Sequence, residues 1–232
     1  MTRHWMQLAS GIALALALAT STAVASPTGL NNIPTADTPG DHQIVFQAYY
    51  TTDADRAHDL WLAFKGGLHF ELASDAVLRF EYGLDGRVAD EGAGPTVAQF
   101  KLAGDIGEGL PSLAFGAANI AFTDSDREDA GQVFPYGVIS QGLGVLRLHA
   151  GYGFASDNKA AFFGLDRSFD LGRTRLTPRF DITQIDDRDQ WLGSAGFIWE
   201  LTKNIAVEAW VSQPFDAGET TLTLKLDIGF SF

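Results

Sequence analysis

Histidine and serine are the residue types in this chain whose spacing could support catalysis or metal binding. The histidines that follow the first 25 residues are His42, His58, His69 and His149. None of them shows the H-x-x-x-H spacing of many metal sites, so we predict no metal ligands. Ser140 and His149 flank one predicted turn, but His149 shares a face with Arg147, and we assign that face to the interior of the sheet. A hydrolase that takes its substrate from outside the sheet needs both side chains to point outward. We therefore predict no catalytic residues, no cofactor and no enzymatic activity.

Acidic runs lie between the apolar stretches, and the densest is residues 124–129, with the sequence DSDRED. Carboxylate oxygens are ligands for Ca²⁺, but this run lacks the glycine and the ligand spacing of a defined calcium loop. A solvated loop explains the run equally well. Divalent cations therefore stay open as partners of the acidic loops.

Charged residues alternate with apolar residues along several runs, which gathers the charges on one face. Arg175, Arg179 and Asp181, for example, alternate with Leu176 and Phe180. Charges on an enclosed face persist only when they are hydrated or paired. The pattern predicts a lumen lined by Arg79, Glu81, Lys101, Arg147, His149, Asp166, Arg175, Arg179, Asp181, Lys225 and Asp227. Two interpretations stay open: a narrow water-filled pore whose arginines select anions, or a ladder of ion pairs that closes the lumen.

Alternation of apolar and polar residues over runs of about ten positions continues from residue 42 to residue 232. Connections between these runs alternate between short turns and longer acidic loops, as in transmembrane β-barrels. We predict an all-β fold, a closed antiparallel transmembrane barrel of about 12 strands with short periplasmic turns and acidic extracellular loops. The predicted strands are 42–50, 59–72, 76–85, 95–103, 111–122, 132–140, 144–154, 159–169, 173–183, 190–200, 204–212 and 220–232.

The first 41 residues do not fit the strand pattern. Residues 1–25 combine Arg3, a short apolar run and Ala23-Val24-Ala25, which predicts a signal peptide that is cut after Ala25. The apolar run is too short for a spanning helix. Prolines and turn-forming residues in 26–41 exclude helix and central strand, so we expect an extended periplasmic lead-in ahead of the barrel at 42–232. The exported chain has no cysteine, so it must be held together by packing and backbone hydrogen bonds.

Charge and aromatic placement agree with a barrel in a membrane. The net charge of -13 argues against nucleic acid as a partner. Most of the net negative charge falls in the longer loops, and we assign Asp85 to one of these loops. Aromatic side chains near predicted strand ends, including Tyr49 and Tyr136, are typical of interface girdles. For Trp61 and Trp210 the inward face is equally compatible with the pattern.

Two stretches resemble known outer-membrane proteins. The chain ends in Phe232, preceded at alternate positions by Phe230, Ile228 and Leu226, which resembles the strand that outer-membrane proteins present to their insertion machinery. Phe230 and Phe232 are therefore the expected insertion signal. Residues 29–36, GLNNIPTA, are similar to the G-L-x-x-x-P-T-A opening of YjbH-like proteins, a group associated with exopolysaccharide export. That resemblance covers eight residues and transfers no catalytic residue.

Together these features predict a cell outer-membrane protein whose partners are membrane lipid, lipopolysaccharide and the barrel-insertion machinery. The function that we expect is a small channel or transporter for polar or anionic solutes. A structural or exopolysaccharide-export barrel with a plugged lumen is the alternative, and an outer-membrane lipid-modifying enzyme is the third hypothesis.

Overall fold

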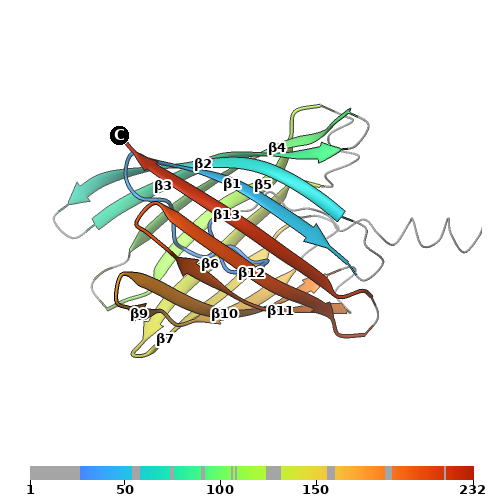
Figure 1. Cartoon of the computed structure of the whole chain (residues 1–232). Coiled ribbons are helices and arrows are strands. Elements are labelled where there is room, and N and C mark those ends of the chain that lie inside the picture. Colours follow the sequence, from blue (N-terminus) through green and yellow to red (C-terminus); the bar gives the residue numbers. More distant parts are fainter. Residues whose placement is uncertain are drawn as a thin grey trace, which may run out of the picture.

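The computed structural model describes residues 27–53, 58–73, 76–89, 92–105, 107, 109–123, 132–155, 160–185, 190–216 and 218–232. The predicted signal peptide and the acidic run 124–129 lie outside these residues. Strands wrap into one closed barrel with the C-terminus at one rim (Figure 1). We call this end, which carries Gln43, Ser231 and Phe232, the C-terminal rim, and the opposite end the loop rim.

Every predicted strand is present, and each connects to its neighbour in antiparallel pairing. The strands are β1 (Gln43–Thr52), β2 (His58–Ala73), β3 (Ala76–Ala89), β4 (Gly92–Asp105), β5 (Ser112–Ala121), β6 (Phe134–Leu143), β7 (Leu146–Gly153), β8 (Ala161–Asp166), β9 (Phe169–Leu171), β10 (Thr174–Ile185), β11 (Gln190–Glu200), β12 (Ile205–Pro214) and β13 (Thr221–Ser231). β8 and β9 both pair with β10, so together they take the place of one strand in the barrel wall. Counted in this way the barrel has 12 strands, and the predicted number is confirmed.

Closure comes from pairing of the first and last strands, with Gln43 opposite Ser231 and Thr52 opposite Leu222. A closed sheet leaves no row of unpaired backbone groups facing the surroundings, which a hydrocarbon solvent requires. Gly144 and Gly172 hold the tight turns after β6 and β9 with φ of 65° and 71°, a region that a side chain disfavours.

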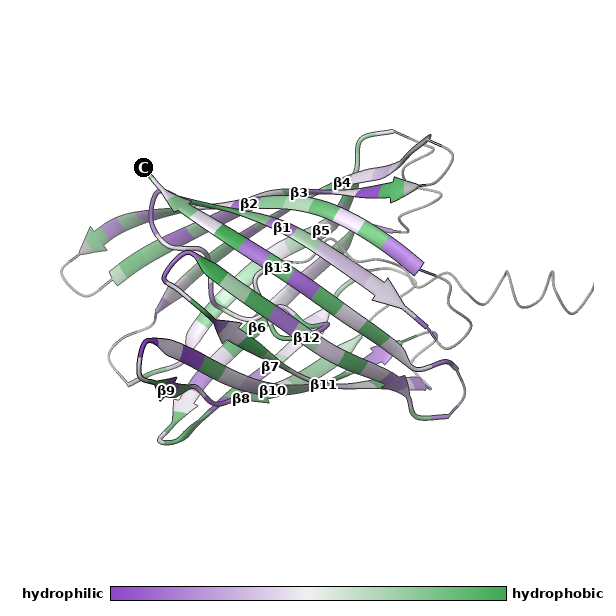
Figure 2. Cartoon of the chain, viewed as in Figure 1, coloured by the Kyte–Doolittle hydropathy of each residue, from purple (hydrophilic) through white to green (hydrophobic). Residues whose placement is uncertain are grey.

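The two faces of each strand differ as the alternation predicts, and the stripes are visible in Figure 2. On β13, Leu222, Leu224 and Phe230 are exposed on the outer wall, while Thr223 faces inward and is buried. On β2, Leu62 is exposed and Lys65 is buried. An apolar outer band around a polar interior is the pattern of a barrel surrounded by lipid. Among the described residues, no helix is long and apolar enough to cross a membrane.

The interior contains side chains that we had placed elsewhere. Asp85, assigned to a loop, is fully buried in β3 and accepts a hydrogen bond from the hydroxyl of Tyr49. Tyr49 stacks on Trp61 inside the barrel, and Tyr136 and Trp210 are also buried. Asp85 lies inside because β3 continues to Ala89, four residues beyond its predicted end. Tyr49 and Tyr136 correct the expected interface girdle, because the alternation along β1 and β6 turns both side chains inward. For Trp61 and Trp210 the structure has the inward alternative.

Residues 27–41, which we call the N-terminal segment, lie inside the barrel, whereas we had expected them to form a periplasmic lead-in. The segment contributes Leu30, Ile33 and Ala36 to a buried cluster with the wall residues Trp61 and Phe162. The blue trace in Figure 1 shows the segment within the ring of strands. Prolines exclude this segment from helix and central strand, but they do not exclude it from the space that the sheet encloses.

Candidate functional site

The N-terminal segment folds back on itself as a short hairpin. Leu30 N donates to Ile33 O at 3.0 Å, and Thr35 N donates to Thr28 O at 3.2 Å. Gly29 and Pro34 form an antiparallel bridge between the two arms. The hairpin therefore satisfies some of its backbone N–H and C=O groups internally. Other polar groups of the segment form hydrogen bonds with the barrel wall.

The first arm is held by an ion pair of the wall. Lys101 Nζ lies 3.0 Å from Glu81 Oε2, and both side chains are fully buried. Thr28 N donates to Glu81 Oε1 at 2.8 Å, and Thr28 O accepts from Lys101 Nζ at 2.8 Å. A buried ion pair needs further hydrogen bonds to offset its desolvation, and the backbone of Thr28 supplies them.

The tip of the hairpin meets three further strands. Asn31 N donates to Asp181 Oδ2 at 2.9 Å, and Arg179 Nε donates to Asn31 Oδ1 at 2.8 Å. Asn32 Nδ2 donates to Ser194 Oγ at 2.5 Å and to Ser212 Oγ at 2.8 Å. The tip is therefore anchored by side chains from β10, β11 and β12.

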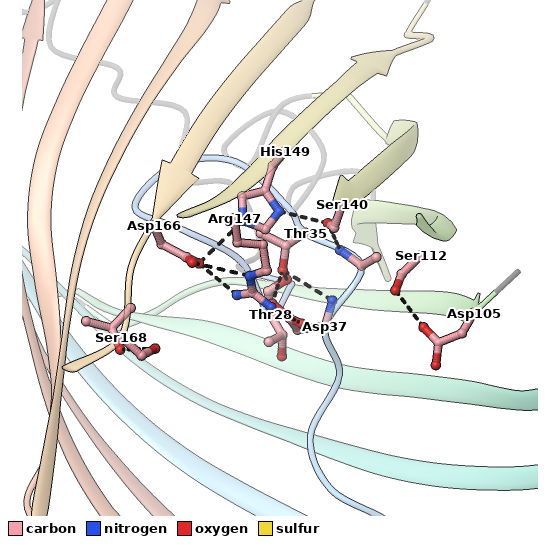
Figure 3. Close-up of polar contacts among 12 residues, drawn as sticks. Thr28, Thr35, Asp37, Asp105, Ser112, Ser140, Arg147, His149, Asp166 and Ser168 are labelled. Carbon is pink, nitrogen blue, oxygen red and sulfur yellow. Dashed lines mark hydrogen bonds and ion pairs between the residues drawn. The ribbon is translucent and has the colours of Figure 1, made fainter. Parts of the chain in front are cut away.

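The second arm meets a row of polar side chains on β6, β7 and β8 (Figure 3). Ala36 N donates to Ser140 Oγ at 3.0 Å. Ser140 Oγ lies 2.7 Å from His149 Nδ1, and His149 Nε2 lies 3.3 Å from Asp166 Oδ2. A carboxylate only accepts, so Nε2 carries a proton. In the neutral imidazole Nδ1 is then the acceptor for the Ser140 hydroxyl.

Arg147 joins this row to the segment. Its guanidinium donates to both oxygens of Asp166, at 3.2 and 2.7 Å, and to Asp37 Oδ1 at 2.7 Å. Burial disfavours the ionised form of Asp37, but the charge of Arg147 and the hydroxyl of Thr35 outweigh it and keep the Asp37 pKa below its usual value. Asp37 is therefore docked as a carboxylate.

The segment leaves the barrel at the C-terminal rim beside His69. His69 N donates to Asp41 Oδ1 at 2.8 Å, and His69 Nε2 lies 3.1 Å from Pro39 O. The hydrogen bond from His69 N and a second one from the His42 side chain lower the pKa of Asp41. Gly67 makes this exit possible, because a Cβ there would lie 2.4 Å from Pro39 O.

A second group of charges lies on β12 and β13. Glu208 accepts from Arg179 through Oε2 and from Lys225 Nζ through Oε1, the latter at 3.0 Å. Asp227 accepts from Gln47 Nε2 at 2.8 Å. A cavity of about 110 Å³ separates these side chains and Lys65 from Thr28 and Gly29 of the segment. The segment and the paired charges thus occupy the lumen around this cavity.

The structure brings most of the predicted lumen residues together and separates two. Glu81, Lys101, Arg147, His149, Asp166, Arg179, Asp181, Lys225 and Asp227 lie along the interior wall. Arg79 pairs instead with Asp105 at the C-terminal rim. Arg175 pairs with Asp170 at the same rim, and its side chain is about half exposed, so it lies apart from the lumen residues. Phe230 and Phe232 are exposed near this rim, and Phe232 N donates to His42 O at 3.1 Å.

Sequence reasoning missed the polar residues that hold the segment. Asn31, Asn32 and Asp37 were part of the lead-in, while Ser140 and Glu208 were not assigned to the lumen. The period-two pattern contained a signal for Glu208, which alternates with Val207 and Ala209 on β12. No sequence signal connects Asn31 to Asp181, which lies 150 positions away. Among the described residues, no group of three or more histidine, aspartate or glutamate side chains could hold a metal ion.

Comparison with known proteins supports the fold. No family model and no curated protein matches the sequence. Among solved structures, the KdgM porin is 10% identical at a TM-score of 0.50 and covers 81% of this chain and 99% of its own. An outer membrane channel from Pseudomonas putida F1 is 12% identical at a TM-score of 0.51 and covers 88% and 99%.

Outer membrane phospholipase A from Escherichia coli also has this barrel. It is 11% identical at a TM-score of 0.54, and the match covers 82% of this chain and 93% of that protein. This finding corrects our prediction that the chain is not an enzyme, because the same fold includes an enzyme and therefore does not support that exclusion. The chain has the closed antiparallel fold of outer-membrane β-barrel proteins.

Proposed function

We propose that this chain is an outer-membrane channel for small polar solutes whose lumen is closed by its own N-terminal segment. The observation that carries the proposal is the way the segment is held. Its polar contacts with the wall are hydrogen bonds and ion pairs along both arms and the tip, from Thr28 to Asp37. Water can replace these polar contacts at small net cost. The apolar packing of Leu30, Ile33 and Ala36 against the wall favours the docked state, so we expect the segment to be docked most of the time.

The wall behind the segment supports a polar path. The barrel interior buries cationic and anionic side chains together. The cations are Lys65, Lys101 and Arg179, and the anions are Glu81 and Glu208. If the segment moves out, these side chains face water, which is where charged groups are stable. A lumen of this kind suits a hydrated solute.

The pairing of the charges bears on the solute. Lys101, Arg147, Arg179 and Lys225 each have a carboxylate partner on the barrel wall. Their positive charge is therefore compensated locally, and the anion preference that we expected from the arginines gains no support. We propose polar solutes without a preference for charge sign.

Conductance of the purified protein in planar bilayers tests the proposal. The full mature chain should be closed with brief openings, and a variant lacking residues 26–41 should conduct continuously. The chain has no cysteine, so an A36C/S140C pair gives a clean lock. The Ala36 N to Ser140 Oγ distance of 3.0 Å holds the two Cα atoms within about 7 Å of each other, which is the upper limit for a disulfide.

The locked variant distinguishes a gate from a permanent plug. Oxidation should abolish the brief openings and a reductant should restore them, while A36C and S140C alone should not respond. If the full chain never conducts and the reductant changes nothing, the segment is a permanent plug and the barrel is structural. If the variant lacking the segment does not conduct either, the channel proposal is wrong.

A further inference from the structure

We infer that Ser140 is a latent nucleophile that the N-terminal segment covers, and that it accepts acyl groups from small polar esters once the segment leaves the lumen. The inference rests on the proposed movement of the segment. It concerns catalysis at a site in the lumen, whereas the proposed function concerns conductance through the lumen.

Three side chains have the relationship that an activated hydroxyl needs. Ser140 Oγ is 2.7 Å from His149 Nδ1, so the imidazole can take the hydroxyl proton. Asp166 Oδ2 is 3.3 Å from His149 Nε2, so it orients the ring and stabilises the imidazolium that forms. A nucleophile within reach of a base, and a base oriented by a third group, are the signature of nucleophilic catalysis. Figure 3 shows the three residues in this order.

The segment blocks this arrangement directly. Ala36 N donates its hydrogen to Ser140 Oγ at 3.0 Å and occupies an oxygen lone pair that would attack a substrate. Thr35 and Ala36 are themselves almost fully buried, and Ser140 is only 6% exposed. Arg147 fastens the neighbouring residue, Asp37. Removal of the segment frees the lone pair and the space above it.

Arg147 sets the expected strength of the activation. It donates two hydrogen bonds to Asp166 and fixes the carboxylate beside His149. It also shares the Asp166 carboxylate with His149, so Asp166 is not available to the imidazole alone. A general base typically contributes a factor of about 10² to 10⁴, and we expect the lower end of that range.

The reaction follows from the donors and acceptors. Ser140 Oγ bonds to the ester carbonyl carbon and its proton moves to His149 Nδ1. The bond from that carbon to the alcohol oxygen then breaks, and the alcohol leaves with the proton. Water next attacks the acyl-serine, which releases a carboxylic acid and restores the hydroxyl. The site faces the lumen, so the substrate is a water-soluble ester and not a membrane lipid.

Ser194 and Ser212 provide a matched control. They also lie inside the barrel under the hairpin, both are buried, and both contact Asn32. Their described side-chain partners are Asn32 and each other, with no histidine among them. Removal of the segment uncovers all three serines, but only Ser140 has a base beside it.

Labelling with a small fluorophosphonate, followed by peptide mass spectrometry, tests the inference. In the variant lacking residues 26–41, Ser140 should label about a hundredfold faster than Ser194 or Ser212. H149Q should bring its rate down to theirs, and the full chain should label slowly. Hydrolysis of p-nitrophenyl acetate should follow the same order and be absent in S140A.

Equal labelling of the three serines, or labelling that H149Q leaves unchanged, would overturn the inference. The full-length N32A/D37N variant, which loses contacts at both ends of the hairpin, serves as a second background should the deletion fail to fold. If the variant lacking residues 26–41 does not conduct, the channel proposal is wrong. If that variant conducts but Ser140, Ser194 and Ser212 label at equal rates, only the nucleophile inference is wrong.

Discussion

Arg147 Nη1 of β7 lies 2.7 Å from Asp37 Oδ1 of the N-terminal segment, and both side chains are 39% exposed. This ion pair joins the N-terminal segment to the barrel wall at a solvent-accessible position. A partly exposed pair contributes little to stability, typically under about 1 kcal/mol. It therefore suits an equilibrium between docked and released states better than the buried contacts around Glu81.

The D37N variant tests this pair. Removing the charge should weaken docking by about 1 kcal/mol, which corresponds to a roughly fivefold larger released fraction. Single-channel recording should show more frequent openings with unchanged conductance, because the path itself is the same. The matched control is D170N, which breaks the exposed pair with Arg175 at the rim and touches no segment residue. Equal opening frequencies in D37N and the unmodified chain would contradict the role of the pair.

The same carboxylate predicts a pH dependence. Its pKa is lowered when docked, so the docked state gains stability that is present above the ordinary value of 3.8 and is lost as pH falls through the lowered pKa. Opening frequency should therefore rise as the pH falls below the ordinary value of 3.8, as recorded with the same membrane at each pH. D37N should lack this component, and an identical pH profile in D37N would assign the effect to other groups.

The strands were predictable because their pattern is local. Outward apolar residues of β13 and β3 recur every second position, and a single frame shift would turn charges such as Lys225 toward lipid. The break between β8 and β9 was not predictable. Arg167 and Ser168 interrupt the pairing, but Arg167 N still donates to Pro178 O, and the guanidinium of Arg167 lies over the ring of Phe169. The sequence there reads as one continuous strand.

Glu208 is expected to be critical for stability of the barrel. It accepts from both Arg179 and Lys225, so E208A leaves two buried cations without this partner. Removal of one member of a buried ion pair typically costs about 3 to 5 kcal/mol. Urea unfolding in lipid vesicles should show a loss of about 3 kcal/mol, since the adjoining cavity gives some access to water. D170N should cost less than about 1 kcal/mol. Similar losses in both variants would contradict the assigned role.

Gly164 gives space to the hairpin tip. A Cβ at this position of β8 would lie 2.3 Å from Leu30 Cδ1 and 2.8 Å from Ile33 Cδ1. G164A should therefore displace the tip and raise the opening frequency several-fold. G142A adds the same atom where no other atom lies within 4 Å, and it should behave like the unmodified chain. A G164A protein that stays closed to the same extent would show that Leu30 turns aside without moving the hairpin.

The terminal aromatic residues give a prediction about biogenesis. Deletion of Phe232 should reduce the amount of barrel in the outer membrane of cells several-fold, because we expect this residue to be part of the insertion signal. Refolding of the purified variant in detergent should be unchanged, since Phe232 is exposed and lies after the last strand. Heat-modifiable gel migration measures both. A variant impaired equally in detergent and in cells would assign Phe232 a structural role instead.

The candidate site was much less predictable than the strands. Alternation identified His149 and Asp166 as inward residues, because strand geometry fixes the direction of each side chain. It could not show that Ser140 lies beside His149, which depends on the register of β6 against β7. Nor could it place the N-terminal segment, whose hydrogen-bond partners are distributed from His69 to Ser212. Residues without a repeating pattern carry no local signal for the surface that they meet.

The closure of the sheet by β1 and β13 has a consequence for assembly. The N-terminal segment directly precedes β1 and lies inside the ring that this pairing completes. Either the strands close around an N-terminal segment that is already in place, or the hairpin enters the closed barrel from one end. The first route needs Asn31 and Thr28 to find their partners while an edge is still open. The order of β1–β13 pairing and hairpin docking then decides whether a newly assembled barrel is closed by its segment.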